Sequence, residues 1–398
     1  DTDKIKRAAR RVAAAKKQGY AVVVVVSALG DTTDDLMDLC QKITSSPSRR
    51  ELDMLLSTGE QISTALLAMA LHQIKVDAVS LTGFQVGIQT DASHTRARIL
   101  GVSRERLMTE LGRGRVVVVA GFQGVGPEKE ITTLGRGGSD LTALALAKAL
   151  GARACEIYTD VEGVFTADPR RVPEARKIHR ISYEEMLELA SSGAQVMQSR
   201  SIELAGKFDV PIHVRSSATG KQGTWIVKGD SSMENILVRG VTANKNEAKI
   251  TLRNITDRPG MAGALFRQIA TAGINVDMII QNIAVSGRRT DISFTVSAAD
   301  LNEAVRVISK IRPAIEKKHI IADRDIAKIS VVGIGMRSHS GVAADMFEVL
   351  GKNRINIDMI STSEIKISCV VQKKNADRAV RVLHQHFIKQ KDRYTVVK

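Results

Sequence analysis

Cysteine and aromatic residues are both scarce in this 398-residue sequence. The three cysteines, Cys40, Cys155 and Cys369, are too far apart to indicate a metal-binding pair or a disulfide framework, so we expect three reduced thiols. Aromatic residues make up only 3% of the chain, which leaves few side chains that could stack on bases. The composition therefore argues against a nucleic-acid-binding protein.

Long apolar runs are also missing from the sequence. No stretch approaches the length of a membrane span, and the first residues show no apolar signal region. We therefore predict a cytoplasmic protein without a membrane partner. Apolar residues at 43% and charged residues at 25% are ordinary for a globular protein, and the length suffices for two or three domains.

Positive charge is what the sequence has in excess, with a formal net charge of +15. The basic residues are scattered, and the densest stretch, residues 4–17, alternates with alanine and valine as an amphipathic helix does. We interpret most of the excess as solvated surface, and the remainder as the lining of a site for an anionic substrate.

Strand and helix patterns alternate in the first part of the chain, which predicts an α/β domain with a mostly parallel sheet. In such a domain the loops at the carboxyl ends of the strands surround the ligand. The predicted strands are residues 22–27, 78–81, 116–120, 156–159, 212–215 and 224–227. The predicted helices are residues 5–13, 51–74, 103–111, 141–150, 183–191 and 200–208.

An internal repeat follows a change of composition after residues 228–232. We predict a first domain over 1–232, a linker over 233–247, and two repeat units over 248–326 and 327–398. Each unit is expected to run strand, loop, helix, strand, strand, helix, strand, and the two units should pack as a pair. The repeated positions are Gly260, Ala262, Phe266, Ile274, Asn275, Asp277 and Met278, which align without a gap with Gly341, Ala343, Phe347, Ile355, Asn356, Asp358 and Met359.

The glycine-rich run at residues 133–140, Thr-Leu-Gly-Arg-Gly-Gly-Ser-Asp, is the most informative motif. Its glycines let the backbone approach a ligand, and the following helix begins with free N–H groups that favour an anion. Arg136 can bind a carboxylate or phosphate through two hydrogen bonds. The alternative is an ordinary turn in which Ser139 or Asp140 only caps the helix.

Two further segments add hydroxyl and acidic groups. Residues 27–33, Ser-Ala-Leu-Gly-Asp-Thr-Thr, follow the first strand and can bind phosphate or carboxylate, although such residues also form ordinary turns. Residues 57–61, Ser-Thr-Gly-Glu-Gln, interrupt a helical pattern with a glycine beside Glu60, which could accept hydrogen bonds from a substrate ammonium group. The alternative for Glu60 alone is a solvated helix glutamate.

Residues 158–170 leave a strand, turn at Gly163 and end in Asp-Pro-Arg. A series of polar groups around one aromatic side chain suits a nucleotide, with Phe165 near the base and Arg170 near a phosphate. A structural Asp-Pro turn explains only the end of this run.

Together these motifs resemble the aspartokinases, the aspartate kinases of the amino-acid-kinase superfamily, over essentially the whole chain. The most specific segments are residues 122–124, 133–140, 158–170, 215–217 and 360–367. The resemblance implies an α/β/α sandwich of the amino-acid-kinase type with a mostly parallel sheet, followed by two ACT domains of βαββαβ, ferredoxin-like topology. It also implies the transfer of the ATP γ-phosphate to the side-chain carboxylate of L-aspartate. That product, 4-phospho-L-aspartate, leads toward lysine, threonine and methionine.

The resemblance assigns roles to individual residues. Asp140 and Arg136 would be catalytic, with Asp140 organising the transfer site. L-aspartate would be bound by Thr33, Glu60, Arg136 and Ser139. ATP would contact Thr159, Asp160, Phe165, Arg170 and Gln195, the last at a position where many relatives have lysine. Mg²⁺ would bridge the phosphates without a dedicated protein metal site.

Feedback control is implied for the repeat. The resemblance places a lysine or threonine effector near Asp277, Gln281, Asn282, Thr362 and Glu364, and Asp277 has the alternative of a loop-ending residue equivalent to Asp358. ACT domains pair edge to edge, so a homodimer is expected, with room for additional subunits.

The family's first strand, with its Lys-Phe-Gly-Gly-Thr motif, has no counterpart here because the sequence begins in the helix that follows it. The activity of this chain as printed is therefore left open. A non-catalytic subunit that binds lysine or threonine and another small-carboxylate kinase of the same fold are the competing hypotheses.

Overall fold

The structure is a computed structural model that describes residues 2–194, 196–229, 237–282, 289–311, 319–339 and 341–389. It divides into two compact units. Unit 1 contains residues 1–164, 179–183 and 196–229, and unit 2 contains residues 165–178, 184–195 and 230–398. Two short segments before residue 196 thus belong with the C-terminal part, which the predicted linker at 233–247 did not anticipate.

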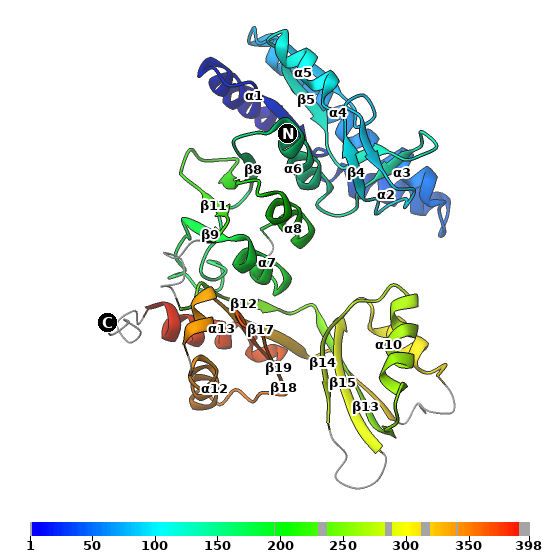
Figure 1. Ribbon diagram of the computed structural model, residues 1–398, viewed down its shortest axis with the longest axis vertical. Coiled ribbons are helices and arrows are strands. Elements are labelled where there is room, and N and C mark those ends of the chain that lie inside the picture. The colour runs from blue at the N-terminus through cyan, green and yellow to red at the C-terminus, as the bar shows by residue number, and fades with distance from the viewer. Residues whose placement is uncertain are drawn as a thin grey trace. The chain divides into compact units, whose positions relative to one another are not determined.

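Unit 1 is built around a parallel sheet in the order β1-β5-β2, formed by β1 (Val23–Val26), β5 (Val116–Ala120) and β2 (Ala78–Leu81) (Figure 1). Because successive residues of a strand face opposite sides, β5 contributes Val116 and Val118 to one apolar cluster and Val117 and Val119 to another. The first cluster packs against helices α1 (Thr2–Lys17) and α4 (Thr58–Gln73), the second against α5 (Glu105–Gly112) and α6 (Gly138–Leu150). The predicted α/β/α layering is confirmed.

Two smaller sheets complete unit 1. One has the order β8-β10-β11-β9 and the other β4-β3-β6-β7. Their strands are β8 (Cys155–Thr159), β10 (Ile212–Ser216), β11 (Thr224–Val227), β9 (Arg180–Ser182), β4 (Ile99–Val102), β3 (Ile88–Thr90), β6 (Gln123–Val125) and β7 (Ile131–Thr133). The remaining helices of unit 1 are α2 (Thr32–Ile43), α3 (Arg49–Leu56) and α8 (Ser199–Phe208), whereas α7 (Tyr183–Ser191) belongs to unit 2 except for its first residue.

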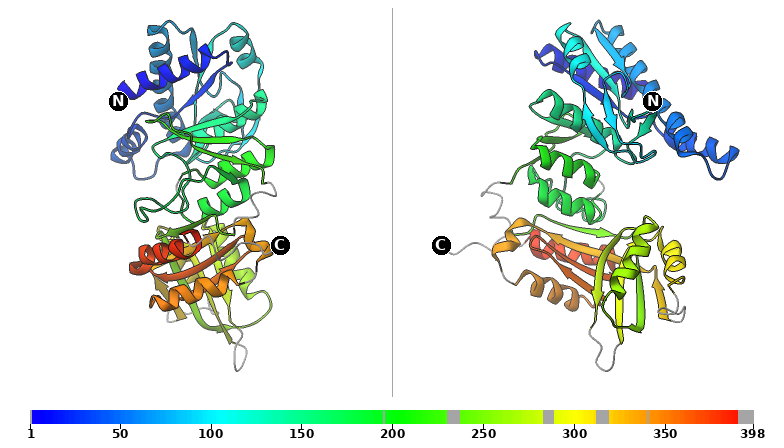
Figure 2. Two further views of the ribbon diagram at one scale, coloured as in Figure 1. Left: turned by 90° about the vertical axis from the view of Figure 1, so that its left-hand side faces the viewer. Right: turned by 45° about the vertical axis from the view of Figure 1, so that its right-hand side comes forward.

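Unit 2 contains two four-stranded antiparallel sheets. The first has the order β14-β15-β13-β16, with β13 (Glu247–Thr256), α10 (Met261–Thr271), β14 (Val276–Gln281), β15 (Arg289–Ser297), α11 (Leu301–Ile308) and β16 (Ile320–Asp323). The second has the order β12-β17-β19-β18, with β12 (Gly240–Asn244), β17 (Ile326–Val332), α12 (Val342–Lys352), β18 (Met359–Thr362), β19 (Lys366–Gln372) and α13 (Ala376–His384). Short 3₁₀ turns at Ile334–Ser338 and Lys373–Asn375 and a π-helical turn at Gln385–Lys389 complete it. In each sheet both helices pack on one face, as Figure 2 shows for α12 and α13.

Part of the predicted linker is a strand. Residues 240–244 form β12, which pairs antiparallel with β17 and takes the edge position that β16 occupies in the first repeat. The second repeat thus receives an edge strand from the segment that precedes the first. Residues 390–398, the end of the predicted second unit, lie outside the described residues. A five-residue strand carries too short an alternating pattern to be distinguished from a linker by sequence.

One helical stretch contradicts the prediction that no apolar run approaches the length of a membrane span. Residues Arg49–Gln73, which span α3 and α4, are long and apolar enough to cross a membrane by length and hydropathy alone. Half of the apolar window is buried inside the protein, and Asp53 and Glu60 within the stretch are both buried. The prediction that no stretch approaches that length was therefore wrong, although this one serves as core helices.

Candidate active site

The glycine-rich loop joins β7 to α6 in unit 1. Gly135 and Gly137 have φ values of 76° and 72°, in the left-handed region that favours glycine. Gly137 is the residue that precedes the helix, and α6 receives no side-chain capping hydrogen bond. The alternative in which Ser139 or Asp140 only caps the helix is therefore wrong, because both side chains lie in the first turn of α6 and are left for other contacts.

The loop lies very close to the carboxyl end of β5. A Cβ added at Gly138 would lie 2.7 Å from the Phe122 ring, and one added at Gly121 would lie 2.6 Å from Ser139 Oγ. Gly121 also donates its N–H to the carbonyl of Val26, the last residue of β1, at 3.0 Å. Ser139 is thus held beside the point where β1 and β5 end.

Glu60 is hydrogen-bonded to the segment that follows β1, at the same edge of the sheet. Gly59 allows α4 to approach Ala28, where an added Cβ would lie 2.9 Å from the Ala28 Cβ. The Ala28 N–H then donates to Glu60 Oε1 at 3.1 Å. Since Ala28 follows β1 by only two residues, Glu60 and Ser139 both lie around the carboxyl end of β1. A Cβ added at Gly59 would also lie 3.5 Å from Thr32 Cγ2, so the segment that contains Thr33 reaches this edge of the sheet.

The environment of Glu60 is unusual for a glutamate. Its side chain is buried, with a residue exposure of 4%, so the alternative of a solvated helix glutamate is wrong. Within the described part of the chain, Glu60 Oε2 has no hydrogen-bond partner. Burial raises the pKa of Glu60 to about 7, against the effect of the hydrogen bond from Ala28. A buried oxygen of this kind is suited to receive a cationic group from a ligand.

The glycine-rich loop supplies the opposite charge. Arg136 is exposed, and no ion pair or hydrogen bond of its guanidinium is found among the described residues. Asp140, in the first turn of α6, is partly buried, and burial raises its pKa to about 6. The edge of the sheet thus combines a guanidinium, hydroxyl groups, helix N–H groups and two carboxyl groups of raised pKa.

The predicted nucleotide residues fall in both units. In unit 1, Thr159 ends β8 and donates to Asp160 Oδ1 at 3.0 Å, and its carbonyl accepts the N–H of Ser217 at 2.7 Å. In unit 2, Phe165 forms an isolated bridge with Lys177. Gln195 lies outside the described residues.

Arg170 is engaged within unit 2. Its guanidinium donates to the two oxygens of Asp168 at 3.0 and 3.1 Å, and its N–H donates to Asp168 Oδ1 at 3.0 Å. The Asp-Pro turn foreseen as an alternative is therefore present, with Asp168 as its acceptor. Whether Arg170 also contacts a phosphate stays a prediction.

Asp277, the first predicted effector residue, has a partner in the other repeat. Its carboxylate pairs with Lys328 Nζ on β17, and Lys328 Nζ also lies 3.6 Å from Glu247 Oε1. Reciprocally, Asp358 of the second repeat pairs with Lys249 of β13 at 3.1 Å. The two lysines hold equivalent places in the repeated sequence Ala-Lys-Ile, so each repeat pairs its aspartate with the other's lysine.

The other predicted effector residues are exposed. Gln281 ends β14 and Asn282 follows it, and Thr362 ends β18. Glu364 Oε2 lies 3.1 Å from Arg337 Nε. An apolar cluster that contains Met278 of β14 and Met359 of β18 brings these strands together, so the expectation that the repeats pack as a pair is confirmed.

Comparison with known proteins defines the class of this molecule. Residues 1–216 match the model of the amino acid kinase family, and residues 253–311 and 329–387 each match the ACT domain. Fold, site and family models agree on a kinase of the amino acid kinase family with tandem ACT domains.

Individual relatives make the assignment narrower. The aspartokinase of Mycolicibacterium smegmatis is 49% identical over 392 residues, which cover 97% of this chain and 93% of the relative. Among solved structures, E. coli aspartokinase III in complex with aspartate and ADP has a TM-score of 0.74 at 27% identity, with 88% of this chain and 79% of that chain covered. The same relative in complex with lysine and aspartate, in its T-state, has a TM-score of 0.68 at 27% identity, with 89% and 79% covered. The chain therefore belongs to the aspartokinase family of enzymes, as its motifs predicted.

Proposed function

We propose that this protein transfers the γ-phosphate of ATP to the side-chain carboxylate of L-aspartate. One observation carries the proposal: a buried, unpartnered carboxyl oxygen of Glu60 and the exposed guanidinium of Arg136 belong to segments that meet at one edge of the sheet. L-aspartate has an ammonium group and two carboxylates, so it offers a partner to each. The E. coli relative in complex with aspartate and ADP supports this choice of substrates.

In the proposed reaction, Glu60 holds the substrate ammonium, while Arg136, Ser139 and Thr33 hold its carboxylates. A carboxylate oxygen attacks the γ-phosphorus, the bond to the bridging oxygen of ADP breaks, and the products are 4-phospho-L-aspartate and ADP. Catalysis here consists mainly of positioning and charge stabilisation. Arg136 and the N-terminus of α6 would face the developing negative charge, and Asp140 would orient the groups around it.

ATP would be bound by Thr159, Asp160, Phe165, Arg170 and Gln195. No group of three or more potential metal ligands occurs among the described residues. We propose a Mg²⁺ ion that is bound mostly by phosphates and water and takes at most one or two carboxylates, such as Asp160, from the protein.

We further propose feedback inhibition by lysine, threonine or both, through Asp277, Gln281, Asn282, Thr362 and Glu364 of the ACT repeats. The lysine complex of the E. coli relative supports lysine as an effector. We propose a cytoplasmic homodimer that pairs through its ACT domains.

Product trapping with hydroxylamine tests the reaction, because an acyl phosphate reacts with it to give a hydroxamate. The full-length gene product is incubated with ATP, Mg²⁺ and either L-aspartate, L-glutamate or succinate. We expect hydroxamate with L-aspartate alone, and less of it when lysine or threonine is added. Hydroxamate from another acid would support a different small-carboxylate kinase. Binding of lysine or threonine without any hydroxamate would support a non-catalytic regulatory chain.

A further inference from the structure

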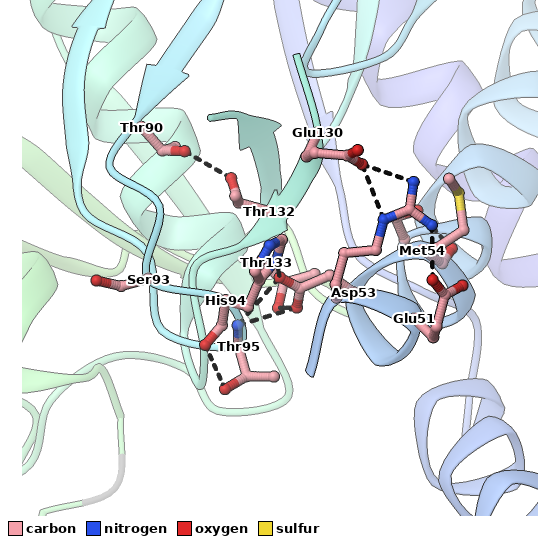
Figure 3. A network of polar contacts seen from close by, with 12 residues as sticks. Glu51, Asp53, Met54, Thr90, Ser93, His94, Thr95, Glu130, Thr132 and Thr133 are labelled. Carbon is pink, nitrogen blue, oxygen red and sulfur yellow. Dashed lines mark hydrogen bonds and ion pairs between the residues drawn. The ribbon is translucent and has the colours of Figure 1, made fainter. Parts of the chain in front are cut away.

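A fully buried aspartate, Asp53, lies at the centre of a polar network that includes Thr133, the first residue of the glycine-rich run (Figure 3). It belongs to α3, and its exposure is 0%. A carboxylate in such a place is costly unless donors surround it. In this case the donors come from two other segments, the loop at residues 94–95 and the last residue of β7.

Four contacts satisfy the carboxylate. The Thr95 N–H lies 3.0 and 3.1 Å from the two oxygens, and Thr133 Oγ1 donates to Oδ1 at 2.5 Å. His94 Nδ1 lies 2.7 Å from Oδ2. Because a carboxylate only accepts, the His94 ring must present its Nδ1 hydrogen to it. Thr95 has φ of 68°, a conformation that is rare for a residue with a branched side chain and that the surrounding contacts must maintain.

These contacts lead directly to the glycine-rich loop. Thr133 is the residue before Leu134 and Gly135, and its carbonyl accepts the Ala97 N–H at 2.8 Å. A Cβ added at Gly135 would lie 3.1 Å from the carbonyl oxygen of Thr95, so the loop at 94–97 supports the glycine-rich loop from one side. Arg200 donates to the carbonyls of Leu134 and Ala97 at 2.9 and 2.8 Å and ties the two loops together.

Asp53 also connects this loop to the helix that carries Glu60. Helix α3 ends at Leu56, and α4 begins at Thr58. Ser57 between them is buried, donates its N–H to the Asp53 carbonyl at 3.1 Å, and accepts a hydrogen bond from Gln123 Nε2 at 2.9 Å. Only six residues of nearly continuous helix therefore separate Asp53 from Glu60, which leaves little freedom between them.

We propose that Asp53 is a positioning residue that fixes the glycine-rich loop, through Thr133 and Thr95, against the helix that carries Glu60. The inference rests on the proposed function, since it assigns to Asp53 the alignment of the two segments that bind L-aspartate. Such alignment matters because a displacement of about 1 Å at a catalytic group can cost a hundredfold in rate. None of the atoms of Asp53 is required to touch the substrate.

Two neighbouring threonines of β7 provide a matched test. Thr133→Val removes the hydroxyl that binds Asp53, whereas Thr132→Val removes one that binds Thr90 Oγ1 at 2.6 Å. Both hydroxyls are buried, and the two side chains point to opposite faces of the strand. We expect Thr133→Val to raise the KM for L-aspartate about tenfold, with the KM for ATP within about twofold of the wild type. Thr132→Val should leave both KM values within about twofold.

Equal effects of the two valine variants, or a wild-type KM for L-aspartate in Thr133→Val, would overturn the proposal. If Thr133→Val does not fold, Asp53→Asn and Asp53→Ser decide. The side-chain amide of asparagine can accept the hydrogen bond from Thr133 Oγ1 and can donate one to His94 Nδ1 when the ring carries its hydrogen on Nε2. We therefore expect the KM for L-aspartate in Asp53→Asn to stay within about threefold of the wild type. The serine side chain is too short to reach Thr133 and His94, so we expect the KM for L-aspartate to rise at least about tenfold in Asp53→Ser. Equal KM values for these two variants would contradict the role of Asp53.

The outcomes separate this inference from the proposed function. If the wild-type protein forms no hydroxamate from L-aspartate, the proposed function fails. If the wild-type protein forms it and the threonine variants behave alike, only the role of Asp53 fails.

Discussion

In the proposed function, the buried carboxyl group of Glu60 binds the ammonium group of L-aspartate, so the free energy of ionising Glu60 would contribute to substrate binding. In the substrate-free protein the pKa of Glu60 is raised to about 7 because its carboxyl group has lost most of its hydration. A bound ammonium group would restore the stability of the ionised form. Substrate binding and proton release are therefore expected to be linked, so that kcat/KM for L-aspartate rises with pH through about 7.

Glu60→Gln should increase stability and decrease activity. Between the ordinary pKa of 4.5 and about 7, the folded protein retains a proton that the unfolded chain has released, so the free energy of unfolding falls as pH rises through this range. The glutamine side chain does not ionise, so the variant does not lose stability in this way. Its free energy of unfolding should exceed that of the wild type by about 1 to 3 kcal/mol at pH 8, and by little at pH 5. The aspartate KM should rise at least about tenfold.

Thermal unfolding of both proteins at pH 5 and pH 8 measures the effect. Glu51→Gln is the control, because Glu51 lies on the preceding helix with a side chain 65% exposed. A gain in stability that does not change with pH, or one that Glu51→Gln shares, would show that burial of Glu60 is not the cause.

At the scale of elements, α6 is bounded by two left-handed glycines with different surroundings. Gly137 has φ of 72°, and an added Cβ would lie 2.3 Å from Gln198 Cγ, whereas Gly151 has φ of 60° and nothing within 4 Å. Alanine at either position should cost about 1 to 2 kcal/mol in conformational strain. Only Gly137→Ala should also lower kcat/KM for L-aspartate, because it displaces the loop that carries Arg136. Equal losses of activity in both variants would contradict the assigned role of the loop.

The reciprocal lysine–aspartate pairs make a second prediction at this scale. Lys328 has a side chain only 3% exposed and faces both Asp277 and Glu247, while Lys249 is 19% exposed and faces Asp358. Lys328→Met leaves two carboxylates without a counter-charge and should lower the free energy of unfolding by about 3 to 5 kcal/mol. Lys249→Met should cost about 1 kcal/mol. Circular dichroism should show the earlier unfolding of Lys328→Met.

Trp225 provides an internal control for that experiment. It is the single tryptophan of the chain and lies on β11 in unit 1. Its fluorescence should therefore report unfolding of unit 1 at an unchanged temperature in both lysine variants. A shift of the fluorescence transition as large as that of circular dichroism would contradict a stabilising role confined to the repeats.

Sequence patterns predicted some elements well and missed others for a physical reason. Strands β2, β5 and β11 and helix α7 have the predicted bounds, because continuous apolar runs and helical periodicity are properties of short segments. Strands β3, β6 and β7 have three residues each and include glycine and threonine, so their pairing depends on tertiary contacts. Asp53 was missed because an acidic residue in an amphipathic helix is normally exposed.

At the scale of the whole molecule, the units are not continuous in sequence. Residues 165–178 belong to unit 2 because Thr166 bonds His384 Nε2 at 2.8 Å and accepts the Val241 N–H at 2.8 Å. Residues 184–195 belong there because the buried Glu185 pairs with Arg239 and accepts the Ile334 N–H at 3.1 Å. Contacts between residues more than 50 positions apart leave no local sequence pattern, so the linker predicted at 233–247 could not reveal them.

The central claim is that one site in unit 1 uses Arg136 and Glu60 to select L-aspartate as the phosphoryl acceptor. The most direct test is the initial rate of ADP formation by the full-length protein, measured with ATP and Mg²⁺ in the presence and absence of L-aspartate, for the wild type and for Arg136→Ala. We predict an L-aspartate-dependent rate in the wild type and a loss of at least about a hundredfold in kcat/KM in the variant. ADP formation that is independent of L-aspartate, or an Arg136→Ala variant as active as the wild type, would contradict the account.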